Sequence, residues 1–353
     1  MGELDRPLLA ALTGDAEIEA LLSDRAMLRA MLEFEGALAE AEAEAGLIGH
    51  EAAEDIADAI LAFTPDWANL AQGMARDGVV VPALVRQLRG AVGDPYGGSV
   101  HRGATSQDVI DSALMLQLGR IWPILDARLE VLDRGFERLI EEFGEQRAMA
   151  HTRMQAALPI AAADKIAAWR TPLARLRPQL AQGAKAMLVV QVGGPVGDRS
   201  SFDGHGDAVA AGVAARLGLA DGDCWHTQRD RLVGFATQLS LISGVLGKLG
   251  ADVVLLAQSE VAEIRLATGG GSSAMPHKTN PVAAEVLQAL ARHSAGLIGT
   301  LNNALLHEGE RSGAAWTLEW LVLPQIVMAA GAGMRLAHEL VSGISFADAG
   351  RGT

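Results

Sequence analysis

The chain has 353 residues, of which 50% are hydrophobic but only 4% are aromatic, and its formal net charge is −14. So acidic a surface repels phosphate backbones, which argues against nucleic acid as a partner. The single cysteine excludes an intrachain disulfide, and the N-terminal segment lacks the basic and apolar regions of a secretory signal. No stretch of about 18 charge-free apolar residues appears, so we expect no membrane span and a cytoplasmic protein.

Apolar residues recur at steps of three and four positions along most of the chain, which is typical of helices with one buried face. The expected helices span residues 16–47, 50–63, 82–89, 106–146, 159–190, 229–267, 282–306 and 314–341. No alternation of apolar and polar residues pairs with a hairpin turn, so the sequence predicts no strands and an all-α fold.

The longest of these helices indicates a bundle. Residues 229–267 contain no proline and would span roughly 60 Å at about 1.5 Å per residue, a length typical of helix bundles. We divide the chain into a small N-terminal helical domain, residues 1–104, and a central long-helix bundle domain, residues 105–345. A tail of residues 346–353 is expected to be poorly ordered. The boundary falls in the glycine-rich segment 90–104.

The most specific motif is GGGSSAMPHKTNP, Gly269–Pro281. Three consecutive glycines allow a loop to open, to close and to bring backbone amides near a ligand. Lys278 offers a positive point charge that binds anions, and Asn280 can donate a hydrogen bond to a carboxylate. By composition alone, an ordinary flexible surface loop is the favoured interpretation.

A second motif, VHRGATSQDVIDSA, covers the point where a loop becomes a helix. Thr105 and Ser106 lie at this helix N-terminus, where free amides and hydroxyls can bind a carboxylate. Simple helix capping by Ser106 is the alternative. His101, in the preceding loop, would by itself be an ordinary surface histidine.

These motifs resemble the conserved regions of the fumarase/aspartase superfamily. The loop matches the superfamily signature G-S-S-x-M-P-x-K-x-N at every specified position, from Gly271 to Asn280. A third segment, AHTRMQAALP, is similar to the superfamily's G-R-T-H-x-Q-x-A-x-P, but Arg153 occupies the histidine position and His151 the arginine position. Arginine cannot shuttle protons at neutral pH, although it can hold a carboxylate with two parallel hydrogen bonds.

The resemblance implies a role for each matching residue. Ser272 would be the catalytic acid/base, with Lys278 and His101 as further catalytic residues. The expected substrate-binding residues are Thr105, Ser106, Thr152, Arg153, Gln155, Ser273, Met275 and Asn280. His151 and Glu285 would support the site, although Glu285 could equally be a solvated helix glutamate. No metal-ligand or nucleotide-binding pattern appears, so we expect neither a metal nor a cofactor.

Three other segments look like one branch of the superfamily, the 3-carboxymuconate cycloisomerases. They are LLSDRAMLRAMLEFEGALAEAEAEAGLI, WHTQRDR and HEGERSGAAWTLEW. This branch implies lactonisation of the tricarboxylate 3-carboxy-cis,cis-muconate to 4-carboxymuconolactone, in the β-ketoadipate pathway of aromatic degradation. It also implies a homotetramer with shared active sites, which fits the positive mean hydropathy. Superfamily members often carry a third, C-terminal helical domain, which we expect to be absent.

Two other functions remain open at this point. An adenylosuccinate-type C–N lyase that releases fumarate is the nearer alternative, and Arg153 argues against it. A non-catalytic structural protein, like the lens crystallins of the argininosuccinate lyase branch, is the alternative from another class. The intact Ser272, Lys278 and Asn280 argue against that second alternative.

Overall fold

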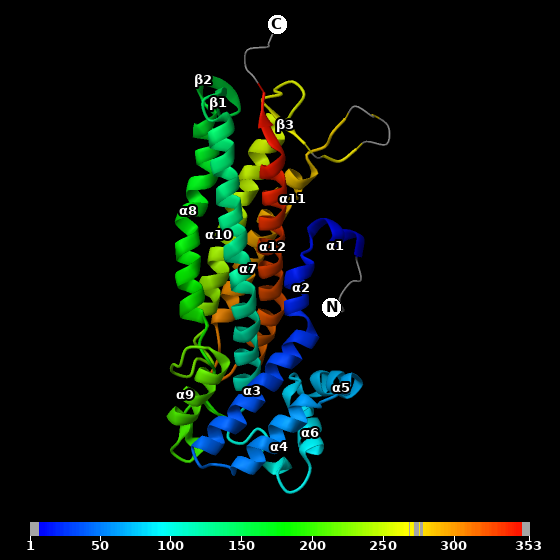
Figure 1. Ribbon diagram of the computed structural model, residues 1–353, viewed down its shortest axis with the longest axis vertical. Helices are drawn as coiled ribbons and strands as arrows, with labels where there is room; N and C mark the ends of the chain where they lie inside the picture. The colour runs from blue at the N-terminus through cyan, green and yellow to red at the C-terminus, as the bar shows by residue number, and fades with distance from the viewer. Residues whose placement is uncertain (1–6, 268, 272–274, 276–277, 348–353) are drawn as a thin grey trace.

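The structure, a computed structural model, describes residues 7–267, 269–271, 275 and 278–347. Its body is a bundle of long helices that run side by side along the longest axis of the molecule (Figure 1). These helices are α7 (Ser106–Phe143), α8 (Ala162–Met187), α10 (Asp230–Leu256), α11 (Val282–Leu301) and α12 (Gly313–Gly343). The fold is therefore all-α in its body, as the periodicity predicts.

The other helices gather mainly at the end of the bundle where α7 begins (Figure 1). They are α1 (Pro7–Thr13), α2 (Ala16–Leu22), α3 (Asp24–Glu44), α4 (His50–Leu61), α5 (Trp67–Asp77), α6 (Val81–Val92) and α9 (Gly206–Leu217). Of these, α1 and α2 instead lie against the flank of the bundle. The division of the chain near residue 104 stays a prediction.

Two pairs of short strands contradict the expectation of no strands. β1 (Arg147–Thr152) and β2 (Gln155–Ala161) form an antiparallel hairpin at the end of the bundle where α7 finishes (Figure 1). β3 (Ile264–Leu266) pairs with β4 (Ile344–Phe346). The strand β4 thus extends into the tail that was expected to be poorly ordered, and residues 348–353 lie outside the described residues.

Several predicted helix ends are wrong for identifiable reasons. The helix expected over 16–47 is broken at Ser23, whose hydroxyl accepts a hydrogen bond from the Ala26 amide at 3.3 Å and so begins a new helix. The helix expected from Pro159 begins only after the hairpin, at Ala162. The helix expected to reach residue 267 ends at Leu256.

Most of the bundle core is aliphatic, with a few large aromatic side chains. Trp169, Phe136 and Phe235 each expose 1% of their surface or less. Burying a large apolar side chain of this kind contributes roughly 1.5–3 kcal/mol. The shared core therefore stabilises the side-by-side packing of these helices. A second apolar cluster joins α3, α4 and α6 to α9 and to the first turns of α7.

A buried ionic network joins three helices of the bundle. The Arg229 guanidinium lies beside Asp111 of α7 and Glu319 of α12, and none of the three side chains is exposed. Its Nη1 donates to Asp111 Oδ2 at 2.7 Å and its Nε to Glu319 Oε2 at 2.9 Å. The guanidinium also lies over the Trp225 ring, 4.6 Å from its centre. This network fixes the start of α10 against α7 and α12.

In the part of the chain that the structure describes, two helices, α10 and α12, are long and apolar enough to cross a membrane by length and composition alone. However, 50% of the apolar window in α10 and 67% of that in α12 is buried inside the bundle. Core helices of soluble proteins share these properties. Packing in the bundle therefore accounts for their composition.

Candidate active site

The first turn of α7 presents Thr105 and Ser106 at the helix N-terminus, and both are half-buried. The Thr105 amide donates to Asp108 Oδ2 at 3.0 Å, as in a capping box. The amides and the positive end of the helix dipole at this terminus favour a negatively charged group. The structure thus places the predicted carboxylate-binding pair where the sequence suggests.

Asp108 holds this terminus in place through bonds that the sequence did not predict. Its carboxylate has no exposed surface and accepts from the amides of Gly193 and Gly194, at 2.8 and 2.9 Å. It also accepts from His226 Nε2 at 2.9 Å. Burial lowers the pKa of His226, but Asp108 and Cys224 outweigh it and raise this pKa to about 9. His226 is therefore a cation that neutralises Asp108.

Glycine is required where the loop meets Asp108. A Cβ at Gly193 would lie 2.5 Å from Cys224 Sγ, and Gly194 has a φ of 74° with a Cβ position 2.4 Å from Ser201 Oγ. Any side chain there would push the two amides away from Asp108. The sequence motif GGPVG signalled a turn, but its partner lies about 85 residues earlier in the chain.

Arg311 is a second feature that sequence reasoning missed. Its exposed side chain reaches the same end of α7, where Nε donates to Gln107 Oε1 at 2.8 Å and Nη2 to the Pro195 carbonyl at 3.2 Å. This places a guanidinium beside Gln107, the residue that follows Ser106, so Arg311 is a candidate for binding a further carboxylate. Its position in the segment HEGERSGAAWTLEW was the only signal in the sequence.

His101 lies in the loop just before α7, with its backbone in the left-handed region at a φ of 61°. Its Nδ1 donates to Glu35 Oε1 of α3 at 2.7 Å. His101 is thus not the free surface residue that a loop histidine usually is. It belongs to the same end of the bundle as Thr105 and Ser106.

The hairpin carries four predicted residues at its tip. His151 and Thr152 end β1, Arg153 lies in the turn and Gln155 begins β2, and all four are exposed. Arg153 and Met154 both have positive φ, 51° and 64°, as a two-residue turn with the twist of the hairpin requires. None of these side chains contacts Thr105 or Ser106 within the chain.

The glycine-rich loop follows β3. Gly270 and Asn280 exchange two backbone hydrogen bonds, of 2.9 and 2.8 Å, which close the base of the loop. Lys278 and Met275 are exposed and Asn280 is half-buried. The catalytic candidate Ser272, together with Ser273, lies outside the described residues. Glu285 is exposed in the first turn of α11, directly after the loop.

One chain does not bring the predicted residues together. The base of the loop and the hairpin lie at one end of the bundle, whereas the N-terminus of α7 lies at the other (Figure 1). α7 has 38 residues and so separates its two ends by roughly 57 Å, at about 1.5 Å per residue. The predicted site is therefore incomplete within a single chain.

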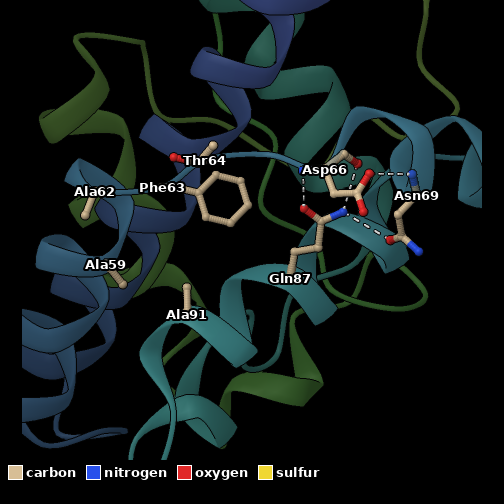
Figure 2. Close-up of a pocket in the computed structure, with 8 residues that line it drawn as sticks. All are labelled: Ala59, Ala62, Phe63, Thr64, Asp66, Asn69, Gln87 and Ala91. Atoms are coloured by element: carbon tan, nitrogen blue, oxygen red, sulfur yellow. Dashed lines mark hydrogen bonds between the residues drawn. The ribbon is translucent and has the colours of Figure 1, made fainter.

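Several cavities among the described residues lie away from the N-terminus of α7, and two of them contain polar side chains of interest. Figure 2 shows one of about 350 Å³ between α4, α5 and α6, where Gln87 accepts from the Asp66 amide and donates to Asn69. These polar groups bond to one another. The other, of about 580 Å³, lies between the hairpin, α8 and α10 and includes His151. Among the described residues, no group of three or more His, Cys, Asp or Glu could hold a metal ion.

The helical bundle and these three motifs define a lyase fold, and comparison with known proteins agrees. Residues 15–296 match the model of the family described as Lyase, and the chain belongs to this family, within the fumarase/aspartase superfamily. The 3-carboxy-cis,cis-muconate cycloisomerase of Pseudomonas aeruginosa is 40% identical over 338 residues, which cover 93% of this chain and 73% of that protein.

Two further relatives bear the same kind of name. The 3-carboxy-cis,cis-muconate cycloisomerase of Bradyrhizobium diazoefficiens is 37% identical over 96% of this chain and 76% of its own length. The crystal structure of the 3-carboxy-cis,cis-muconate lactonizing enzyme from Pseudomonas putida matches with a TM-score of 0.92 and 36% identity. That match covers 98% of this chain and 78% of the other.

Proposed function

We propose that this protein is an isomerase that converts 3-carboxy-cis,cis-muconate to 4-carboxymuconolactone in the β-ketoadipate pathway of aromatic degradation. The observation that carries the proposal is the 40% identity to a relative of that name over 93% of the chain. Arg153 supports it, because an exposed guanidinium in place of the superfamily histidine suits a substrate with an additional carboxylate. The substrate is then a small tricarboxylate, and the reaction needs no cofactor.

In the proposed reaction, an oxygen of one substrate carboxylate forms a bond to a carbon of the diene. The π electron pair moves onto the carbon beside another carboxylate and then forms a C–H bond with a proton. Stabilising the charge that develops on this carboxylate should be the largest catalytic contribution. We assign this stabilisation of charge to Lys278, Asn280 and the loop amides, and we assign delivery of the proton to Ser272.

The remaining carboxylates need fixed partners. Thr105, Ser106, Arg153 and Gln155 are the proposed ones, and Arg311 adds a cation at the same end of α7 as Ser106. Because the nucleophile is tethered to the alkene, much of the entropy cost of bringing the reacting atoms together is already met in the substrate.

We also propose a homotetramer in the cytoplasm, with each active site built from several subunits. The support is geometric: antiparallel packing of bundles would bring the α7 N-terminus of one chain beside the hairpin and loop of others. The hairpin also exposes 71% of Met154 and 71% of Leu158, an apolar surface that a neighbouring subunit would cover.

The test is to mix the purified protein with 3-carboxy-cis,cis-muconate and to follow the loss of ultraviolet absorbance by the diene. The expected result is loss of the diene with formation of the lactone. Adenylosuccinate is the control substrate, since an adenylosuccinate-type lyase would release fumarate from it. Fumarate release without lactone formation would refute the proposal in favour of that alternative, and turnover of neither substrate would favour a structural role.

A further inference from the structure

The proposed lactonisation consumes one proton in each turnover. A carboxylate with one negative charge becomes a neutral ester, and a carbon of the former double bond gains a hydrogen. The trianionic substrate therefore becomes a dianionic lactone, and the proton comes from water. A side chain that carries a proton at neutral pH, close to the carboxylate-binding end of α7, would serve this step.

His101 has the position and the partner that this role requires. Its ring is 14% exposed, whereas the Glu35 carboxylate that accepts from its Nδ1 at 2.7 Å is 1% exposed. This bond fixes the ring through Nδ1. Nε2 is then the nitrogen that can donate a proton to the substrate or to another proton carrier. The positive φ of His101 is unusual for a residue with a side chain, and such conformations cluster at functional sites.

The charges around His101 favour its protonated form. Burial lowers the pKa of His101, but the charge and hydrogen bond of Glu35, together with the charge of Asp108, raise it above the usual value. Arg89 of α6 opposes this effect. The groups that act on His101 thus come from α3, α6 and α7, and Glu35 is the one that also bonds to the ring.

A second buried carboxyl group on α3, that of Glu42, provides an internal comparison. Glu42 has no exposed surface, and neither of its oxygens has a hydrogen-bond partner. Burial raises its pKa to about 8, with Arg102 opposing and Glu35 reinforcing the effect. Glu42 is therefore mostly neutral at pH 7, so it adds little negative charge near His101.

We propose that Glu35 is a positioning residue that orients the His101 ring and keeps it protonated, so that His101 supplies the proton consumed by lactonisation. This inference rests on the proposed function. His101 Nε2 gives up one proton for each proton that the substrate carbon takes up, and the π pair forms the C–H bond. The partly exposed ring then regains a proton from water.

The test compares kcat and KM over the pH range in which histidine titrates, for the full-length chain and for two matched variants. Because His101 acts as an acid, the rate should fall as pH rises through the pKa of His101. This fall in rate is the alkaline limb of the pH profile, and Glu35→Gln should move it to lower pH by roughly one unit or more. The same variant should lower kcat with little change in KM. Glu42→Gln removes an equally buried carboxyl group from the same helix and should leave the limb in place.

An alkaline limb at the same pH in Glu35→Gln and in the unsubstituted protein would overturn the inference, as would an equal displacement in Glu42→Gln. If Glu35→Gln fails to fold, His101→Gln decides the matter, because it should remove the limb entirely. A limb that persists in His101→Gln overturns the inference. Absence of turnover in the unsubstituted protein is a distinct result, because it refutes the proposed function itself.

Discussion

Nε2 of His226 lies 2.9 Å from Oδ1 of Asp108, although the two residues are 118 positions apart in the sequence. Asp108 has no exposed surface and His226 exposes only 4% of its side chain. The pair joins the loop before α10 to the first turn of α7, beside Thr105 and Ser106. The stability of the fold and the shape of the candidate site therefore depend on the same contact.

This contact predicts a pH-dependent stability. The pKa of His226 rises from 6.5 to about 9 on folding, so the pair stabilises the fold fully below about pH 6.5 and loses this contribution as pH rises through about 9. The free energy of unfolding should fall over this window by on the order of 3 kcal/mol. Urea unfolding at a series of pH values measures it. His226→Gln should flatten the decline, whereas His50→Gln, at an exposed histidine, should not; a decline unaffected by His226→Gln would contradict the assignment.

The buried network around Arg229 predicts a large cost for removing its cation. Arg229→Met would leave Asp111 and Glu319 buried without their partner, which should cost about 3–5 kcal/mol of stability. Arg134, whose side chain is 62% exposed and pairs with Glu130, is the matched control. Arg134→Met should cost about 1 kcal/mol or less. Similar urea midpoints for the two variants would show that the network contributes little.

Ser272→Ala should abolish lactonisation without altering the fold. Removing a general acid typically costs about 10²–10⁴-fold in rate, so kcat should fall by at least about 100-fold. Circular dichroism and the oligomeric state, measured by size-exclusion chromatography, should match those of the unsubstituted protein. Near-normal turnover in this variant would remove Ser272 from the mechanism.

Arg153→His should weaken binding of the tricarboxylate more than it slows the chemical step. A hydrogen bond to a charged group contributes roughly 1.5–3 kcal/mol, so KM should rise by about 10- to 100-fold. Arg147→His changes an exposed arginine at the start of the same hairpin and should leave KM unaffected. Unchanged kinetics in Arg153→His would show that the guanidinium does not hold the substrate.

The long helices of the bundle could be predicted from the sequence because their cores depend on local periodicity. The hairpin could not, because its strands are short and show no alternation of apolar and polar residues. They are defined by pairing with each other and by positive φ at Arg153 and Met154. The end of α10 at Leu256 was missed for a related reason. The residues that follow pair as β3 with β4, about 80 positions later, although their composition suits a helix.

The residues of the candidate site also divide into those that the sequence could predict and those that it could not. The motifs revealed Thr105, Arg153 and Lys278, because each lies in one short segment that resembles a superfamily pattern, although Arg153 itself departs from that pattern. Asp108 and Glu35 escaped notice, because their partners lie in distant segments that only the fold brings close. Sequence reasoning thus found the residues proposed to contact the substrate, except Arg311, and missed those that hold them.

The length of α7 has a consequence for mixtures of two inactive variants. Because the helix keeps Ser106 and the glycine-rich loop at opposite ends of each chain, the proposed site needs residues from neighbouring subunits. Two defective proteins, one with Ser106→Ala and one with Ser272→Ala, should therefore repair one another when they are refolded together. Some mixed assemblies would contain a site in which both serines are intact. Activity in the mixture, from two parents that have none, would reveal subunits that share their catalytic parts.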